Sequence, residues 1–289
     1  MSSADTLEKV KKLREITGVG FKDCKNAIDE NKGDIDKSIE YLRKKGIAKA
    51  NKKMQRVAAD GLVSISEKNN NFSIIEINSE TDFVAKNEHF IKFVEEVSEI
   101  SLSKLGDLKS ILNTKMKTGN SVNECLIALI SKIGEKITIR RSDFVGSKNY
   151  VNFSYTHSEV KNNLGKIGVL ISIKTSKKLA ELKEFGKQLT MHVAALSPIA
   201  IDRDGLNKDV VSKEKEIIIE ELKNSGKDIK IVDKIAIGKI NKFINDNTLL
   251  NQEWIIDPKK KVKDVLKEIS GDETIQIIKF VRFKVGEGV

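Results

Sequence analysis

The chain has 289 residues, of which 39% are hydrophobic and 33% are charged, with a formal net charge of +10. This length allows two or three domains, and the composition is that of a globular protein rather than a disordered one. The basic excess indicates an acidic partner, either protein or nucleic acid. No apolar stretch approaches the roughly 18 residues needed to span a membrane, and no apolar leader opens the chain. We therefore expect a cytoplasmic protein with no membrane contact.

Residues 1–55 are predicted to form a small three-helix domain followed by a basic linker. Apolar residues recur at helical spacing over 7–16, 24–28 and 35–42, and Gly46 is predicted to end the third helix. Phe21 follows two glycines in a turn, where we expect it to be an exposed apolar side chain. A module this small usually serves as a binding surface rather than a catalytic scaffold.

A run of seven basic residues, with no acidic one, extends from Arg43 to Arg56. Such a run is compatible with a solvated linker and with a patch that contacts RNA. The sequence alone leaves both interpretations open.

The stretch from Asn78 to Phe90 is the most unusual part of the chain. It joins a predicted strand to a helix whose apolar face begins at Phe90, so Thr81-Asp82-Phe83-Val84 lies on a connection, where functional residues often occur. In one interpretation Thr81 or Asp82 caps the helix and Phe83 packs on the core. In the other, Phe83 is a wedge offered to another protein.

The remaining pattern predicts an α+β core in two halves, 56–147 and 148–289. In each half two strands are followed by helices and one further strand, which suggests related topologies with antiparallel sheets. Ser121 and Glu124 have the spacing of a capping box in the first half. An antiparallel helical hairpin, predicted over about 208–246 with Gly226 at its tip, is inserted into the second half.

Catalytic constellations are scarce in this sequence. None of the three histidines has the spacing of a metal site, and neither phosphate-binding glycine motif occurs. Cys24 and Cys125 lie in helix-period apolar patterns, where buried free thiols are expected. We predict a protein that is not an enzyme, has no metal or cofactor and does not bind a nucleotide directly.

Several short stretches of the chain are informative when taken together. They are Leu13 to Lys25, Gly33-Asp34-Ile35, Ala58 to Gly61, Thr81 to Ala85, Gly134 to Ile137, Ile139-Arg140-Arg141, Met191 to Ala195 and Phe280 to Gly288. Together they resemble the elongation factor Ts family, whose members exchange nucleotide on elongation factor Tu. Each match is weak alone, but their common order along the chain is highly specific.

The resemblance implies a ubiquitin-associated-like N-terminal domain, a two-part α+β core and an inserted coiled-coil hairpin. It also implies that Thr81, Asp82, Phe83 and Val84 dislodge the Mg²⁺ ion of elongation factor Tu. Further contacts with that partner are implied for four residues, namely Arg14, Phe21, Lys22 and His157.

A protein that binds RNA or the ribosome through its basic excess, without exchange activity, is the alternative. Aromatic residues make up only 5% of the chain, and no RNA-binding signature occurs. Nucleic acid is therefore not the expected partner.

Overall fold

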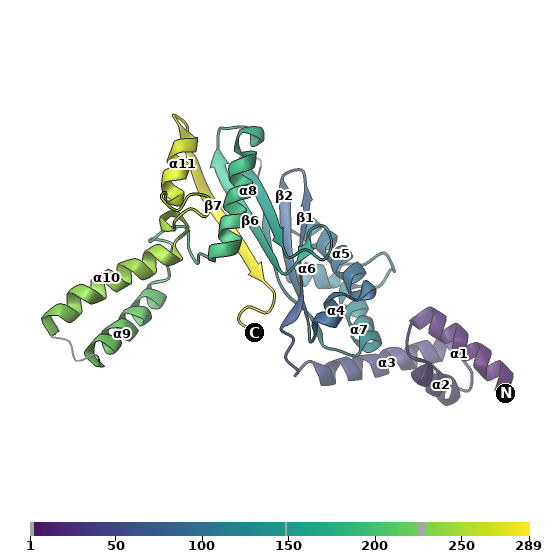
Figure 1. Ribbon diagram of the computed structural model, residues 1–289. Helices are drawn as coiled ribbons and strands as arrows, with labels where there is room; N and C mark the ends of the chain where they lie inside the picture. Colours follow the sequence, from purple (N-terminus) through teal and green to yellow (C-terminus); the bar gives the residue numbers. More distant parts are fainter. Residues whose placement is uncertain (1–2, 148, 225–228) are drawn as a thin grey trace.

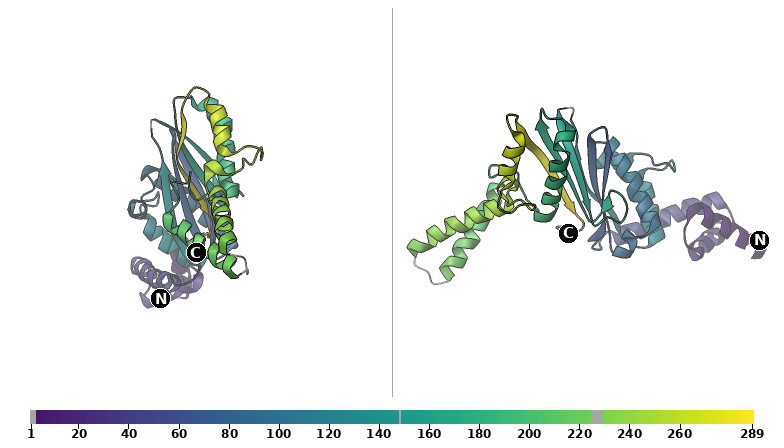
Figure 2. Two further views of the ribbon diagram at one scale, coloured as in Figure 1. Left: turned by 90° about the vertical axis from the view of Figure 1, so that its left-hand side faces the viewer. Right: turned by 45° about the horizontal axis from the view of Figure 1, so that its top comes forward.

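The computed structural model describes residues 3–147, 149–224 and 229–289. The molecule is elongated, with a three-helix part at one end, a helical hairpin at the other and a core of two sheets between them (Figure 1). Figure 2 shows from another side that the two ends project in different directions from the core. The expected α+β class is confirmed, because antiparallel sheets and helices occupy separate layers.

The three-helix part forms around its own small apolar cluster, in which Leu13, Cys24 and Ile28 are buried. Asp34 begins the third helix by accepting a hydrogen bond from the Lys37 amide at 3.0 Å. The helices are α1 (Ser3–Thr17), α2 (Phe21–Glu30) and α3 (Ile35–Lys53).

The prediction that Gly46 ends the third helix is wrong. Helix α3 continues through Gly46 and packs against α7 (Val122–Ile133), where a Cβ on Gly46 would lie 3.5 Å from Ser131. One turn later, Ala50 is buried in the core. This packing outweighs the cost of about 1 kcal/mol for a glycine within a helix, so most of the basic run is helical rather than a linker.

Two antiparallel sheets form the centre of the molecule. In each sheet the second long strand in the chain lies between the first and the third, so the order is β3-β2-β1-β5 in one and β4-β6-β7 in the other. The strands are β1 (Asp60–Lys68), β2 (Asn71–Ser79), β3 (Ile137–Val145), β4 (Tyr150–His157), β5 (Leu164–Gly165), β6 (Ile167–Thr175) and β7 (Ile275–Lys284).

The sheets face each other across an apolar layer that includes Val63, Ile74, Leu170 and Val281. Gly168 permits their close approach, because a Cβ at this position would come within 2.6 Å of the Val63 side chain. The central strands are apolar on both faces instead of alternating, because the other sheet buries one face and helices bury the other.

Helices cover the outer face of each sheet. Phe90 and Val94 of α5 (Glu88–Ser103) are buried in the cluster over the first sheet, which α6 (Leu108–Asn113) and α7 complete. Over the second sheet, α8 (Leu179–Leu196) and α11 (Val262–Ser270) pack around Trp254. The capping box predicted at Ser121 and Glu124 is confirmed at the start of α7.

The inserted hairpin consists of α9 (Lys208–Asn224) and α10 (Ile229–Asn247), followed by a short 3-10 helix, η1 (Leu249–Asn251). Ile218, Leu222 and Ala236 form its apolar seam, and Lys239 pairs with Glu221 at 3.0 Å. The predicted tip at Gly226 lies outside the described residues. Within the described ranges, none of the helices has the length and apolar character required to cross a membrane.

Candidate interaction site

Phe83 lies on a four-residue helix, α4 (Asp82–Ala85), between β2 and α5. Its side chain is 79% exposed, whereas those of Val84 and Ala85 are 5% and 1% exposed. An aromatic side chain this open, with both of the next two residues buried, is not part of its own core. The structure therefore agrees with the exposed interpretation of Phe83 and not with the packed one.

The direction of Phe83 follows from how α4 is fixed at both ends. Val84 and Ala85 point into the core cluster beneath it, so successive helical positions place Phe83 on the outer side. After α4, the Asn87 side chain accepts a hydrogen bond from the His89 amide at 2.9 Å and begins α5. The long helix is thus capped by Asn87 rather than by Thr81 or Asp82, because the extra turn of α4 intervenes.

Thr81 occupies the N-cap position of α4, but its side chain makes no capping hydrogen bond. Instead, the Thr81 amide donates to Glu135 Oε2 at 3.0 Å and its hydroxyl donates to Glu135 Oε1 at 2.9 Å. The neighbouring Glu80 accepts from the Lys136 amide at 2.6 Å. We call these four residues, Glu80, Thr81, Glu135 and Lys136, the tip clasp.

Charges beside Phe83 are paired within the chain. Asp82 bonds to Lys86 at 2.9 Å, and this hydrogen bond, assisted by the charges of Lys86 and Lys166, lowers the pKa of Asp82. Lys166 also pairs with Asp60, and its amide donates to the backbone oxygen of His157 at 3.0 Å. Exposed His157 therefore lies at the same edge of the core as Asp82, and its Nδ1 is 2.9 Å from the Tyr155 hydroxyl.

The other predicted contact residues lie apart from this edge. Arg14, Phe21 and Lys22 are exposed, at the end of α1 and the start of α2, and Figure 1 shows these helices at one end of the molecule. The structure thus places the predicted site residues on two surfaces rather than in one cluster.

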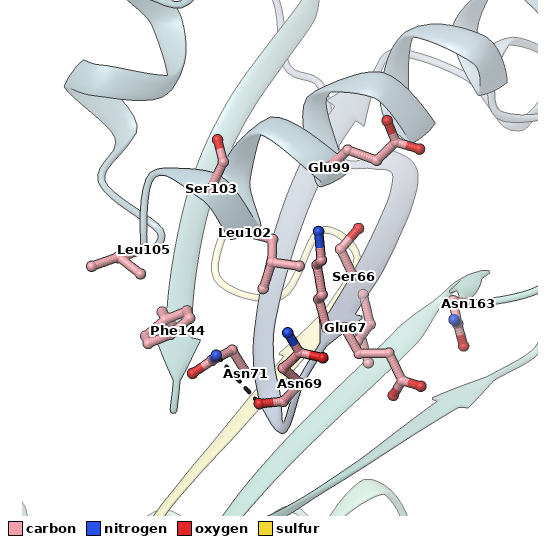
Figure 3. Close-up of a pocket in the computed structure, with 12 residues that line it drawn as sticks. Ser66, Glu67, Asn69, Asn71, Glu99, Leu102, Ser103, Leu105, Phe144 and Asn163 are labelled. Atoms are coloured by element: carbon pink, nitrogen blue, oxygen red, sulfur yellow. Dashed lines mark hydrogen bonds between the residues drawn. The ribbon is translucent and has the colours of Figure 1, made fainter. Parts of the chain in front are cut away.

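A hollow in the described residues is separate from both surfaces (Figure 3). It has a volume of about 760 Å³ and lies between the β1–β2 turn and the end of α5, with Leu102, Leu105 and Phe144 in its lining. The turn at Asn69 is at the opposite end of β1 and β2 from Thr81. The hollow therefore lies away from the β2–α5 connection, where Phe83 is exposed.

The basic run from Arg43 to Arg56 is largely paired with carboxylates. The pairs are Arg43 with Glu124, Lys44 with Glu40 at 2.7 Å, Lys45 with Asp23 at 3.3 Å and Arg56 with Glu80 at 3.3 Å. Charges held in this way offer less attraction to phosphates than an unpaired patch. The run thus helps to join the three-helix part to the core.

In the described part of the chain, no group of three or more His, Cys, Asp or Glu side chains could hold a metal ion. Cys24 is a buried free thiol as expected, whereas Cys125 is only half-buried at the margin of the first-sheet cluster, with its Sγ 3.4 Å from the Thr118 hydroxyl.

The clasp was not foreseen from the sequence. Glu135 and Thr81 are 54 positions apart, so no local pattern pairs them, although both belong to stretches that carry the family resemblance. Thr81 and Glu135 come together through the register of β2 with β3, in which Ser79 lies opposite Ile137.

A family model described as Elongation factor TS matches residues 80–287. Together with the fold and its exposed tip, this match defines the class as a translation elongation factor. The "Elongation factor Ts" of Xanthobacter autotrophicus is 42% identical over 99% of this chain and 94% of its own length. That of Parvibaculum lavamentivorans is 38% identical over 98% and 93%, and that of Rickettsia bellii is 39% identical over 97% and 91%. The chain belongs to the elongation factor Ts family.

Proposed function

We propose that this protein is the guanine-nucleotide exchange factor for elongation factor Tu and that it acts without catalytic chemistry of its own. The observation that carries the proposal is Phe83, which is 79% exposed on a turn fixed by buried neighbours. Family membership supports the choice of partner.

The mechanism follows from what holds a nucleotide in a GTPase. The phosphate loop and a Mg²⁺ ion bridging the phosphate oxygens make most of the contacts that bind the nucleotide. A factor that binds the nucleotide-free form more tightly must weaken nucleotide binding by the same ratio. Phe83, inserted between the partner's Mg²⁺-bearing elements, would dislodge the ion, and Thr81, Asp82 and Val84 set its position.

The expected size of this effect can be stated. Burying a phenylalanine contributes roughly 2–3 kcal/mol, which corresponds to about a 30- to 150-fold shift when the contact exists only in the nucleotide-free state. Because α4 is already ordered before binding, little of this free energy is lost in ordering the loop.

One aromatic side chain does not supply the whole coupling, so a wider grip is part of the proposal. Arg14, Phe21 and Lys22 would hold the GTPase domain from the three-helix part, and His157 would contact the partner from the core. The spacing of these two surfaces is set by α3, which runs from the three-helix part onto α7.

The test is the release of labelled GDP from elongation factor Tu with and without the protein. Phe83→Ala should slow stimulated release by about tenfold or more, because the lost side chain acts only in the nucleotide-free complex. Leu105→Ala removes another exposed apolar side chain, 65% exposed and lining the separate hollow, and should leave the rate unchanged. Equal rates with wild-type protein and Phe83→Ala would contradict the proposal.

A further inference from the structure

The hydrogen-bonded ladder between β2 and β3 ends where Ser79 lies opposite Ile137. Continued in the same register, Glu80 would face Lys136 and Thr81 would face Glu135. The backbones no longer pair there, but side-chain carboxylates take over the role of the missing carbonyl oxygens. Glu80 accepts from the Lys136 amide at 2.6 Å, and Glu135 accepts from the Thr81 amide at 3.0 Å. The tip clasp thus extends the sheet by two positions without extending the strands.

Glu135 contributes most to this extension, because both of its carboxylate oxygens bind Thr81. One accepts from the backbone amide and the other accepts from the hydroxyl at 2.9 Å. Hydrogen bonds to an ionised acceptor are stronger than neutral ones. Two of them on one residue fix both the position of the backbone and the direction in which the chain leaves the sheet. Phe83 follows two residues later.

We propose that Glu135 is a positioning residue for nucleotide exchange, holding Thr81 so that Phe83 stays projected before the partner arrives. This inference rests on the proposed function of Phe83. It assigns the turn before β3 a role in exchange through its hold on the tip. Loss of the clasp would let α4 sample other directions, so that binding would have to order the tip first.

The second half of the core contains a matching carboxylate. Glu273 also lies two residues before a third strand, and there it accepts from the Ser176 hydroxyl and pairs with Lys177 at 3.5 Å. The ladder registers agree, because Thr175 lies opposite Ile275. No exposed aromatic residue follows Ser176, since the chain enters α8 at Leu179. Glu273→Ala is therefore a control that removes the same kind of contact from the other half.

Three substitutions at the clasp separate its parts. Glu135→Ala removes both acceptors of Thr81. Glu135→Gln keeps one acceptor for the Thr81 amide, and its NH₂ group can donate to the Thr81 hydroxyl oxygen, so it should largely restore the clasp. Thr81→Val removes only the hydroxyl and should have an intermediate effect.

Hydrogen exchange tests the clasp without any partner. In Glu135→Ala, amides of the segment 80–87 should exchange at least about tenfold faster than in the wild type, because Thr81 loses both of its hydrogen bonds to Glu135. Glu135→Gln should stay close to the wild type, and Glu273→Ala should leave the segment unchanged. Unaltered exchange of this segment in Glu135→Ala would overturn the inference, whatever the outcome for function.

A double-mutant cycle then tests the role in exchange. Glu135→Ala should slow stimulated GDP release by roughly fivefold in the wild-type background. The loss should be less than about twofold when Phe83 is already alanine, because both changes remove the same contribution of Phe83 to exchange. Glu273→Ala should leave the rate unchanged. Additive losses would show a merely structural role and overturn the inference. Absence of stimulation by the wild-type protein would instead overturn the proposed function.

Discussion

The two halves of the core share one strand order but differ in the segment that follows the central strand of each sheet. In both, the central strand ends beside a carboxylate that precedes the third strand, Glu135 in the first half and Glu273 in the second. In the first half the chain then turns through α4 and exposes Phe83, whereas in the second it enters α8 directly. The second half instead carries its projection later, as the α9–α10 hairpin.

This difference indicates that the repeated sheets supply a rigid scaffold, whereas the connections between the strands supply the exposed, projecting surfaces. Each half also completely buries one ionisable side chain, Glu76 in the first and His192 in the second. Burial alone would raise the pKa of Glu76, but the Gly286 amide, Asn78 and Arg141 together keep it lowered. Burial lowers the pKa of His192 to about 4. One half thus buries a charged group and the other a neutral one.

Phe83 and Phe90, seven positions apart in the first half, allow a side chain that packs in the core to be compared with one that is exposed for partner contact. Phe90 is fully buried in the helix-side cluster, so Phe90→Ala should lower the unfolding free energy by about 3–5 kcal/mol. Phe83→Ala should change it by less than about 0.5 kcal/mol, because an exposed side chain loses little on truncation. Urea unfolding followed by circular dichroism measures both values.

Tryptophan fluorescence in the same urea titration shows whether the two halves of the core unfold together. Trp254 is the only tryptophan of the chain and is buried in the second half. Because an apolar layer joins the two sheets, its fluorescence should report the destabilisation caused by Phe90→Ala. A loss from Phe83→Ala as large as that from Phe90→Ala would mean that Phe83 packs on the core after all.

Acid should destabilise the protein through its second half. The backbone amide of Ile255 donates to His192 Nδ1 at 3.4 Å, so the neutral ring donates from Nε2 to Gln252 Oε1 at 3.0 Å. The folded pKa of about 4 lies below the ordinary histidine value of 6.5, so the unfolded chain takes up the proton first. Stability should be full above pH 6.5 and should fall by about 3 kcal/mol in total as the pH approaches 4.

Unfolding free energies measured between pH 7 and pH 4.5 check this expectation. The window lies above the range in which the lowered pKa of Glu76 matters, because stability from that carboxylate is lost as the pH falls from its ordinary value of 4.5 towards its lower folded value. His192→Gln should flatten the profile, while replacement of exposed His89 and His157 should preserve the slope. A slope that persists in His192→Gln would place the sensitive group elsewhere.

Much of the fold could be predicted from the sequence because its signals are local. The apolar strand segments, the helix periods and the Ser121–Glu124 capping box each depend on residues close together in the chain. The end assigned at Gly46 failed because α3 gains its stability from α7, which lies about eighty residues further on. Local propensity carries no information about that partner.

The candidate site was predictable in identity but not in geometry. The unusual Thr81-to-Val84 stretch was visible at once, yet whether Phe83 turned inward depended on the α4 turn and on buried Val84 and Ala85. The hold of Glu135 on Thr81 arises from strand register. Register is a long-range property that one sequence does not reveal directly.

The central claim is a coupling between this protein and nucleotide on elongation factor Tu, and calorimetry of their complex tests it most directly. Affinity should be highest for nucleotide-free elongation factor Tu without Mg²⁺ and should fall by at least about tenfold with saturating GDP and Mg²⁺, because linkage is reciprocal. Phe83→Ala should reduce that ratio, and the isolated protein should not bind GDP. Equal affinity with and without GDP and Mg²⁺ would contradict the account.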